Sequence, residues 1–166
     1  MQASAGSGIL PNAATLAVVQ DLRKNSTKLV FALFKVEGVE VVPDTTFPSS
    51  ADEQAAVVQF KAGGDEDYAK NFGTTLWPLF LKAIENSTGP RFAVVDFAYT
   101  TGEGRIIREL VSISWCPDKG TPARTKMSFA STKTAFENRI NVGKKYGAND
   151  LADLEHAKVL EAVRAK

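Results

Sequence analysis

Residues 120–140 read GTPARTKMSFASTKTAFENRI, and this stretch predicts one long helix. Thr121 stands where a hydroxyl can cap the first free amides, and Pro122 suits a helix start because its missing N–H costs nothing there. No glycine or proline interrupts residues 123–140, and Asn141 offers a stop. We expect the rest of the chain to be organised around this helix.

The apolar residues of this helix do not form a single straight stripe. They are Met127, Ala130, Phe136 and Ile140, with gaps of 3, 6 and 4 residues, and Phe129 lies outside that set. Hydroxyl side chains crowd the middle of the stretch, where they can bond to earlier carbonyls and bend a helix axis. We therefore expect a bent helix.

Two cations stand at the less favourable end of the helix dipole. Arg124 and Lys126 fall in the first turns, where the partial positive charge of the helix favours anions. Most single surface charges are simply solvated. A partner surface that meets both cations would explain why they are placed there.

Composition restricts the class of protein. The 166 residues carry a net charge of +1 and 44% hydrophobic residues, which suits a single globular domain over 1–166 without the overall basic field of a nucleic-acid-binding protein. One cysteine excludes an intramolecular disulfide and favours a reducing compartment. No apolar run is long enough to span a membrane, and residues 1–10 lack the basic start of a secretory signal.

The rest of the chain predicts a mixed sheet between helices. We expect helices over 13–24, 65–87 and 150–166, and strands over 28–36, 39–42, 91–99, 108–115 and 144–148. The first strand contains KLVFALF, which is apolar at both parities and should be covered on both faces. The fold class is therefore α/β (α+β), with a central mixed sheet of about five strands and helices on both faces.

Two segments are less regular. Residues 1–8 contain small uncharged residues and are expected to form a flexible tail. Residues 43–88 form a longer, insertion-like segment without an assigned role. In it Pro43 and Pro48 predict a loop, residues 55–64 predict a short strand or helix, and Gly73 and Pro78 predict a break or kink in the following helix.

Enzyme signatures are weak. His156 is the single histidine and is expected to be an exposed or partly packed helix residue, and Cys116 lacks the spacing of a metal site. The acidic run 65–67 lacks the alternating ligands of a calcium loop and favours a solvated helix start. An enzyme would need a pocket that joins Asp65, Glu66 and His156. We expect no enzyme, no metal and no cofactor.

One longer motif carries a resemblance to a known family. Residues 115–133, WCPDKGTPARTKMSFASTK, resemble the ADF/cofilin signature, which is Trp-x-Pro-Asp/Glu followed by Pro-x-(Arg/Lys)-x-Lys-Met-x-(Tyr/Phe)-Ala-Ser-(Ser/Thr)-Lys. Residues 91–101, RFAVVDFAYTT, resemble a strand of the family. Residues 7–9, Ser-Gly-Ile, resemble its N-terminal motif, and residues 148–150 and 160–163 resemble its ending. The resemblance covers most of the chain outside 43–88.

The resemblance implies an actin-depolymerising-factor homology domain with the cofilin-like, gelsolin-related fold. It further implies a monomeric, cofactor-free protein of the cytoplasm and cytoskeleton that binds actin monomers and filaments and promotes depolymerisation and severing. Nuclear entry is also allowed. The alternative within the superfamily is a coactosin-like protein, which binds filaments without disassembling them.

By resemblance, the contacts fall on two sets of residues. The monomer-type site consists of Ser7, Gly8, Ile9, Arg124, Lys126, Met127 and Lys133. The weaker filament-type site consists of Arg105, Arg108, Glu161 and Arg164. Ser7 is also the implied phosphorylation site, because a phosphate beside Arg124 and Lys126 would oppose docking.

The chain departs from the family pattern just after Phe136. Many members carry two or three basic residues where this sequence has Glu137 and Asn138, followed only by Arg139. Phosphoinositide binding is therefore expected to be weakened.

Overall fold

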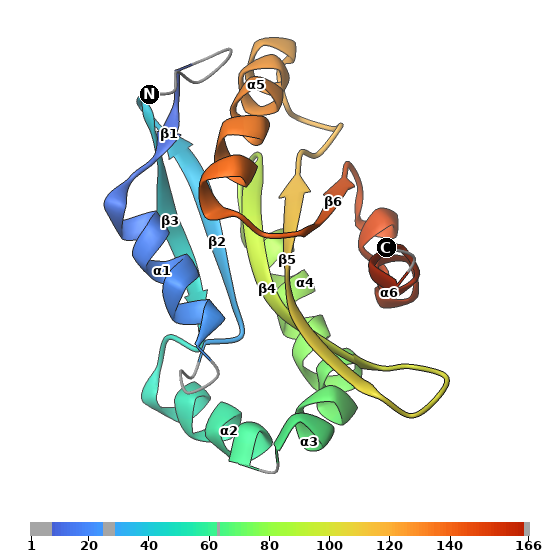
Figure 1. The fold of residues 1–166 in the computed structure, drawn as a ribbon. Coiled ribbons are helices and arrows are strands. Elements are labelled where there is room, and N and C mark those ends of the chain that lie inside the picture. The colour runs from blue at the N-terminus through green and yellow to red at the C-terminus, as the bar shows by residue number, and fades with distance from the viewer. Residues whose placement is uncertain (1–7, 25–28, 63, 165–166) are drawn as a thin grey trace.

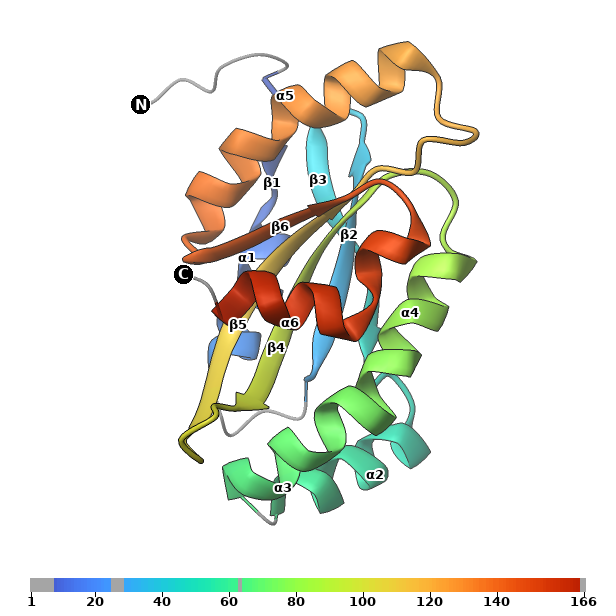
Figure 2. The same cartoon turned by 90° about the vertical axis from the view of Figure 1, so that its right-hand side faces the viewer.

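The computed structural model describes residues 8–24, 29–62 and 64–164, and a sheet of six strands runs through the middle of this part of the chain (Figures 1 and 2). The elements in chain order are β1 (Leu10–Pro11), α1 (Ala13–Arg23), β2 (Phe31–Glu37), β3 (Glu40–Phe47), α2 (Ala51–Ala62), α3 (Gly64–Asn71), the π-helical turn η1 (Phe72–Leu76), α4 (Trp77–Asn86), β4 (Arg91–Thr100), β5 (Ile106–Trp115), α5 (Ala123–Ile140), β6 (Lys144–Ala148), the 3₁₀ turn η2 (Leu151–Leu154) and α6 (His156–Arg164).

The sheet is mixed, as expected. Its order is β1-β3-β2-β4-β5-β6, with antiparallel pairs in the middle and parallel pairs at both edges. The predicted count of about five strands was one short, because β1 has only two residues and its pattern is too short to identify from sequence.

Alternation along the central strands separates two hydrophobic cores. In β4, Ala93, Val95 and Phe97 face the first core, which α2, α3, η1, α4 and α6 cover. Phe92 and Val94 face the second core, which α1 and α5 cover. The prediction that helices flank both faces is confirmed, because strands that are apolar at both parities need a cover on each side.

Residues 43–88 differ from the sequence prediction at their start. Pro43 does not begin a loop, since β3 continues to Phe47. β1 pairs only with Glu40 and Val41, so that from Pro43 onward β3 is an edge strand, where proline is tolerated.

The ambiguous stretch after this strand is helical. Ser50 Oγ accepts a hydrogen bond from the Glu53 N–H at 3.2 Å, and Glu53 Oε1 accepts from the backbone N–H groups of Ser49 and Ser50. These bonds form a capping box at the start of α2. The backbone bond from Ser49 is also the main reason why the pKa of the Glu53 carboxyl is lowered.

The expected kink between α3 and α4 is the π-helical turn η1. Gly73 lies in this turn against the imidazole of His156, and a Cβ at this position would lie 2.7 Å from His156 Cε1. The segment 43–88 thus supplies much of the helical layer over the first core, including Tyr68, Phe72 and Trp77.

The long helix has the predicted bounds but a different start and a different buried stripe. Pro122 is the N-cap, while the Thr121 hydroxyl is buried and, among the described residues, lacks a hydrogen-bond partner, so the predicted Thr121 cap is wrong. The buried residues of α5 are Phe129, Thr132, Phe136 and Ile140, a regular helical stripe.

Thr132 completes that stripe because its hydroxyl is satisfied locally. Its Oγ1 donates to the Ser128 carbonyl at 2.8 Å, so that the polar group can be buried without loss of a hydrogen bond. Figure 2 shows that α5 bends as it crosses the end of the sheet, in agreement with the bend expected from its hydroxyl-rich middle.

His156 is packed inside a group of aromatic rings. Its ring stacks on Phe97 with centroids 5.8 Å apart, and the rings of Phe72 and Trp77 lie within 6.1 Å and 5.7 Å. Its Nε2 is buried and has no hydrogen-bond partner among the described residues. Burial lowers the pKa of His156 because the charged imidazolium would lose its hydration.

The first prediction concerns this histidine. The unfolded chain should protonate near pH 6.5, whereas the folded chain should protonate only at lower pH, so the stabilising contribution of neutral His156 is complete above pH 6.5 and is lost as the pH falls. The free energy of unfolding should fall with a slope of at most about 1.4 kcal/mol per pH unit from this group.

Urea unfolding at about pH 7.5 and about pH 5 measures the effect. His156→Leu should lose less stability between the two pH values than the wild type does. Equal losses in the two proteins would show that His156 titrates in the same way folded and unfolded.

Candidate functional site

Figure 2 shows the first half of α5 lying across one end of the sheet, which gives its outer face no cover from the rest of the described chain. Met127 has an exposed fraction of 71%, although its neighbour Phe129 is buried. Residues two positions apart in a helix are about 200° apart around its axis, so the contact that buries Phe129 turns Met127 outward. An apolar side chain this exposed on a helix is available to a partner.

Cations flank this methionine. Arg124 is exposed, and Lys126 is partly exposed with its Nζ 3.6 Å from Asp118 Oδ1. This pair lies at the surface and contributes little to stability, so a partner carboxylate can compete for the ammonium. The first half of α5 therefore presents an apolar side chain between two positive charges.

The three N-terminal residues of the predicted site differ in what the structure says of them. Ser7 lies outside the described residues. Gly8 is exposed and has φ +76°, a conformation that suits glycine. Ile9 has an exposed fraction of only 8% and belongs to the second core, where it anchors the segment instead of offering its side chain to a partner. β1, which follows it, lies against α5.

Lys133 lies farther along α5, half-buried. With Lys126 it lines a pocket of about 380 Å³ between α5 and the ends of β5 and β6, which also includes Cys116 and Ser114. Burial raises the pKa of the Cys116 thiol, which makes it a poor nucleophile at neutral pH. This agrees with a structural role for the cysteine.

The predicted filament-type residues lie away from the first half of α5. Arg105 is exposed beside the turn between β4 and β5, and Glu161 and Arg164 are exposed on α6. Figure 1 shows that this turn and the first half of α5 lie at opposite ends of the molecule. The structure therefore separates the two predicted sets of residues.

Arg108 differs from its neighbours because its guanidinium is used inside the chain. The side chain is 10% exposed and bonds both carboxylate oxygens of Asp96, with Nε 3.0 Å from Oδ1 and Nη2 2.6 Å from Oδ2. Nη1 lies 3.0 Å from Asp65 Oδ1, and the guanidinium covers the Tyr68 ring at 4.4 Å. Arg108 is thus placed to hold α3 against the sheet.

The pKa values of this group follow from the same contacts. Burial by itself would lower the pKa of Arg108, but the hydrogen bond and the charge of Asp96 raise it above the ordinary arginine value. Burial, with the Asp96 charge, raises the pKa of Tyr68. The arginine is charged at every accessible pH and stays paired.

The residues of the enzyme hypothesis have other roles. Asp65 pairs with Arg108, Glu66 is exposed on α3, and His156 lies among aromatic rings. Within 8–24, 29–62 and 64–164, no group of three or more His, Cys, Asp or Glu residues could hold a metal ion. In the same ranges, no helix is both long enough and apolar enough to cross a membrane.

Two cations that the sequence did not single out also belong near α5. Lys35 and Arg91 line a pocket with Arg124, next to the first half of α5. Lys35 sits in an apolar strand and Arg91 at a strand start, so only the tertiary arrangement brings them to this helix. Arg91 begins the family-like strand 91–101, but that motif implied no contact role for it, and Lys35 lies in no quoted motif.

Solved structures of other proteins share this fold. The fold is similar to the crystal structure of Streptomyces griseoflavus cofilin, with a TM-score of 0.68 and 22% identity over 95% of this chain and 98% of that one. It is equally similar to human coactosin-like protein, with a TM-score of 0.67 and 14% identity over 96% of this chain and 100% of that one. At these identities the likeness shows the fold alone.

The sequence comparison is more specific. Residues 9–164 match the family model described as cofilin/tropomyosin-type actin-binding protein. A cofilin from Gibberella zeae is 32% identical over 117 residues, which is 68% of this chain and 75% of that protein. The chain belongs to the ADF/cofilin family of actin-binding proteins, as its signature motif predicted.

The second prediction tests the internal role of Arg108. Arg108→Ala should lower the free energy of unfolding by about 3–5 kcal/mol, because it removes the guanidinium that bonds both oxygens of the buried Asp96 carboxylate. Arg105→Ala removes an exposed arginine near the same hairpin turn and should change stability by no more than about 0.5 kcal/mol. Urea unfolding measures both, and equal small effects would refute the internal role.

Proposed function

We propose that this chain binds monomeric actin through the first half of α5 and the adjoining N-terminal segment, and that it promotes filament disassembly. The observation that carries the proposal is the exposed Met127 between Arg124 and Lys126, in a member of an actin-binding family. An apolar anchor with cations around it suits a partner that offers an apolar cleft with an acidic rim.

The remaining residues of the proposed surface have different roles. Gly8 extends the surface from β1, with Ile9 as the buried anchor of this segment, and Lys133 extends it along α5. Ser7, which precedes Gly8 in the sequence, is included by resemblance to the family. Filament contacts are assigned to Arg105, Glu161 and Arg164, while Arg108 supports them from inside the protein. On this proposal the protein acts in the cytoplasm, at the actin cytoskeleton.

The proposal does not require catalysis. The protein would act by binding actin more tightly in one state than in another, since a ligand shifts an equilibrium only by its differential affinity. The coactosin-like neighbour keeps a second function under consideration, namely filament binding without disassembly. This alternative shares the fold and differs in what happens to filaments.

The third prediction addresses the monomer-type site. Arg124→Ala/Lys126→Ala should weaken binding to labelled actin monomers by about ten- to hundredfold, because two cations beside the apolar anchor are lost. The matched control is Lys70→Ala/Lys82→Ala, which removes two exposed lysines of α3 and α4 and should leave the affinity unchanged.

Filament length, measured in the same set of proteins, separates the two functions. The wild type should shorten filaments, and the double variant should do so less. If the wild type co-sediments with filaments but leaves their length unchanged, the coactosin-like function replaces the disassembly proposal. Unchanged monomer affinity in Arg124→Ala/Lys126→Ala would overturn the site.

The fourth prediction concerns Ser7. It follows from the sequence motif and from the contact of β1, two residues after Gly8, with α5. Phosphorylation would add about −1.5 to −2 charges near Arg124 and Lys126 and oppose docking of an acidic partner. Ser7→Asp should weaken monomer binding, whereas Ser4→Asp in the same tail should have a smaller effect. Titration with labelled monomers compares the two, and wild-type affinity in Ser7→Asp would refute the switch.

A further inference from the structure

A pocket of about 480 Å³ adjoins the proposed actin surface and is lined by three cations. Its walls come from β2, from the residues just before and at the start of β4, and from the first half of α5. The lining residues are Lys35, Val36, Thr88, Pro90, Arg91, Arg124, Thr125, Ser128 and Phe129. None of these is acidic, and although Asp44 and Glu37 pair with Arg91 and Lys35 from beside the pocket, three cations against two acids leave an excess of positive charge that favours an anionic group.

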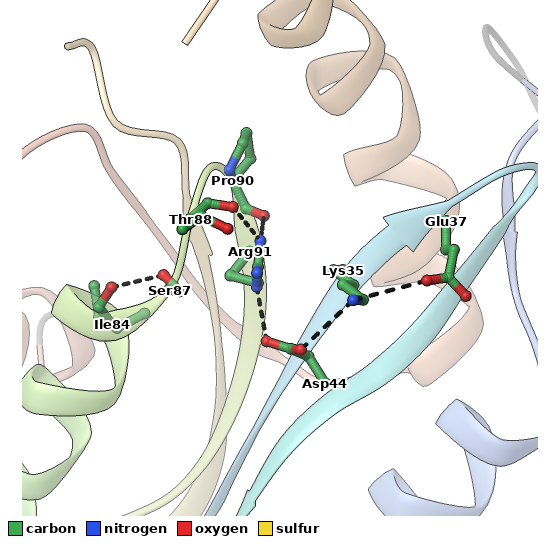
Figure 3. Close-up of polar contacts among 8 residues, drawn as sticks. All are labelled: Lys35, Glu37, Asp44, Ile84, Ser87, Thr88, Pro90 and Arg91. Carbon is green, nitrogen blue, oxygen red and sulfur yellow. Dashed lines mark hydrogen bonds and ion pairs between the residues drawn. The ribbon is translucent and has the colours of Figure 1, made fainter. Parts of the chain in front are cut away.

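Arg91 forms a fixed wall of this pocket. Its exposed fraction is 8%, and its Nε donates to Asp44 Oδ2 at 2.9 Å (Figure 3). Its Nη1 donates to the carbonyls of Thr88 and Pro90, both at 2.9 Å. These bonds hold the guanidinium in one position, so its charge is pre-organised and needs no ordering when a ligand binds.

Lys35 is held more loosely. Its Nζ lies 3.8 Å from Asp44 Oδ1 and 3.7 Å from Glu37 Oε2, and its side chain is 36% exposed (Figure 3). Both distances exceed those of hydrogen bonds, and exposed ion pairs of this kind contribute little to stability. An incoming carboxylate can therefore draw Lys35 away from these acids at small cost.

Arg124 connects this pocket to the surface assigned above. It lines the pocket and lies one helical turn before Met127. Val36 and Phe129 add apolar surface to the lining, which strengthens charge pairs formed against it. A molecule docked on Met127 would reach the pocket without leaving the surface of α5.

We propose that this pocket receives an acidic segment of the same actin molecule that docks on α5. Lys35 and Arg91 then extend the monomer-type surface beyond the signature motif, with Lys35 as a direct contact and Arg91 as the fixed positive wall. The inference rests on the proposed function, because continuity with the Met127 surface and charge complementarity together identify the occupant.

The fifth prediction tests Lys35. Lys35→Glu should weaken monomer binding by about tenfold or more at low salt, and Lys35→Gln by a smaller factor, because the first reverses and the second removes one charge. Lys82→Glu makes the same charge reversal on the exposed face of α4 and should leave the affinity unchanged. The loss in Lys35→Glu should shrink as salt is raised, since screening weakens the charge pair.

A double-mutant cycle identifies a shared partner group. Lys35→Gln and Arg124→Gln should be non-additive when combined if both cations meet the same acidic segment. Thermal unfolding of each variant shows whether it is folded. If Lys35→Glu does not fold, Lys35→Gln still tests the role of the charge.

The outcomes separate the inference from the proposed function. If Arg124→Ala/Lys126→Ala weakens binding but Lys35→Glu and Lys35→Gln behave like Lys82→Glu, the extended surface is wrong and the proposed function stands. If Arg124→Ala/Lys126→Ala has no effect, both fail. If Lys35 variants bind actin normally while inorganic phosphate shifts the amide resonances of Val36 and Ser128, the pocket serves a free anion and the inference is overturned.

Discussion

Phe92 holds α5 on the sheet through two parallel ring contacts. Its centroid lies 4.2 Å from that of Phe129 and 4.5 Å from that of Phe136, with interplanar angles of 16° and 14°. Because the two α5 rings lie two turns apart on one face, they fix the rotation of the helix about its axis as well as its position. Met127 faces outward as a consequence, and the surface assigned to actin depends on that rotation.

The region where α3 meets β4 and β5 depends on a different kind of interaction. There, Arg108 pairs with Asp96 and Asp65 and covers Tyr68, joining α3 to β4 and β5. Burying the pair has a desolvation penalty. Once both charges are buried, however, removing either one alone causes a large loss of stability. The segment 43–88 is therefore an integral part of the protein, since it supplies helices of the first core and also a partner for this arginine.

Much of the fold could be predicted because its signals are local. The bounds of α5 follow from Pro122 and Asn141, and the two hairpins follow from glycines between apolar runs. Reasoning from local sequence failed where a segment close in space changes the burial or the pairing of a residue. Pro43 reads as a loop residue but lies in an edge strand, and Thr132 reads as polar but is buried, with its hydroxyl bonded to Ser128. Residues 55–64 fit a strand or a helix by their own pattern, and the Ser50–Glu53 capping box that precedes them indicates the helix.

The sequence by itself determined the family, the mixed sheet between helices and the cluster of Arg124, Lys126 and Met127, because these depend on short-range patterns and on a long motif. Tertiary structure alone decided which cations remain available. Arg108 and Arg124 are both arginines beside apolar residues, yet the first is enclosed by two carboxylates and the second faces solvent. The tertiary structure also brings Lys35 and Arg91 beside Arg124 from distant parts of the chain. The physical reason is that burial and charge pairing depend on neighbours in space, which sequence spacing does not specify across strands and helices.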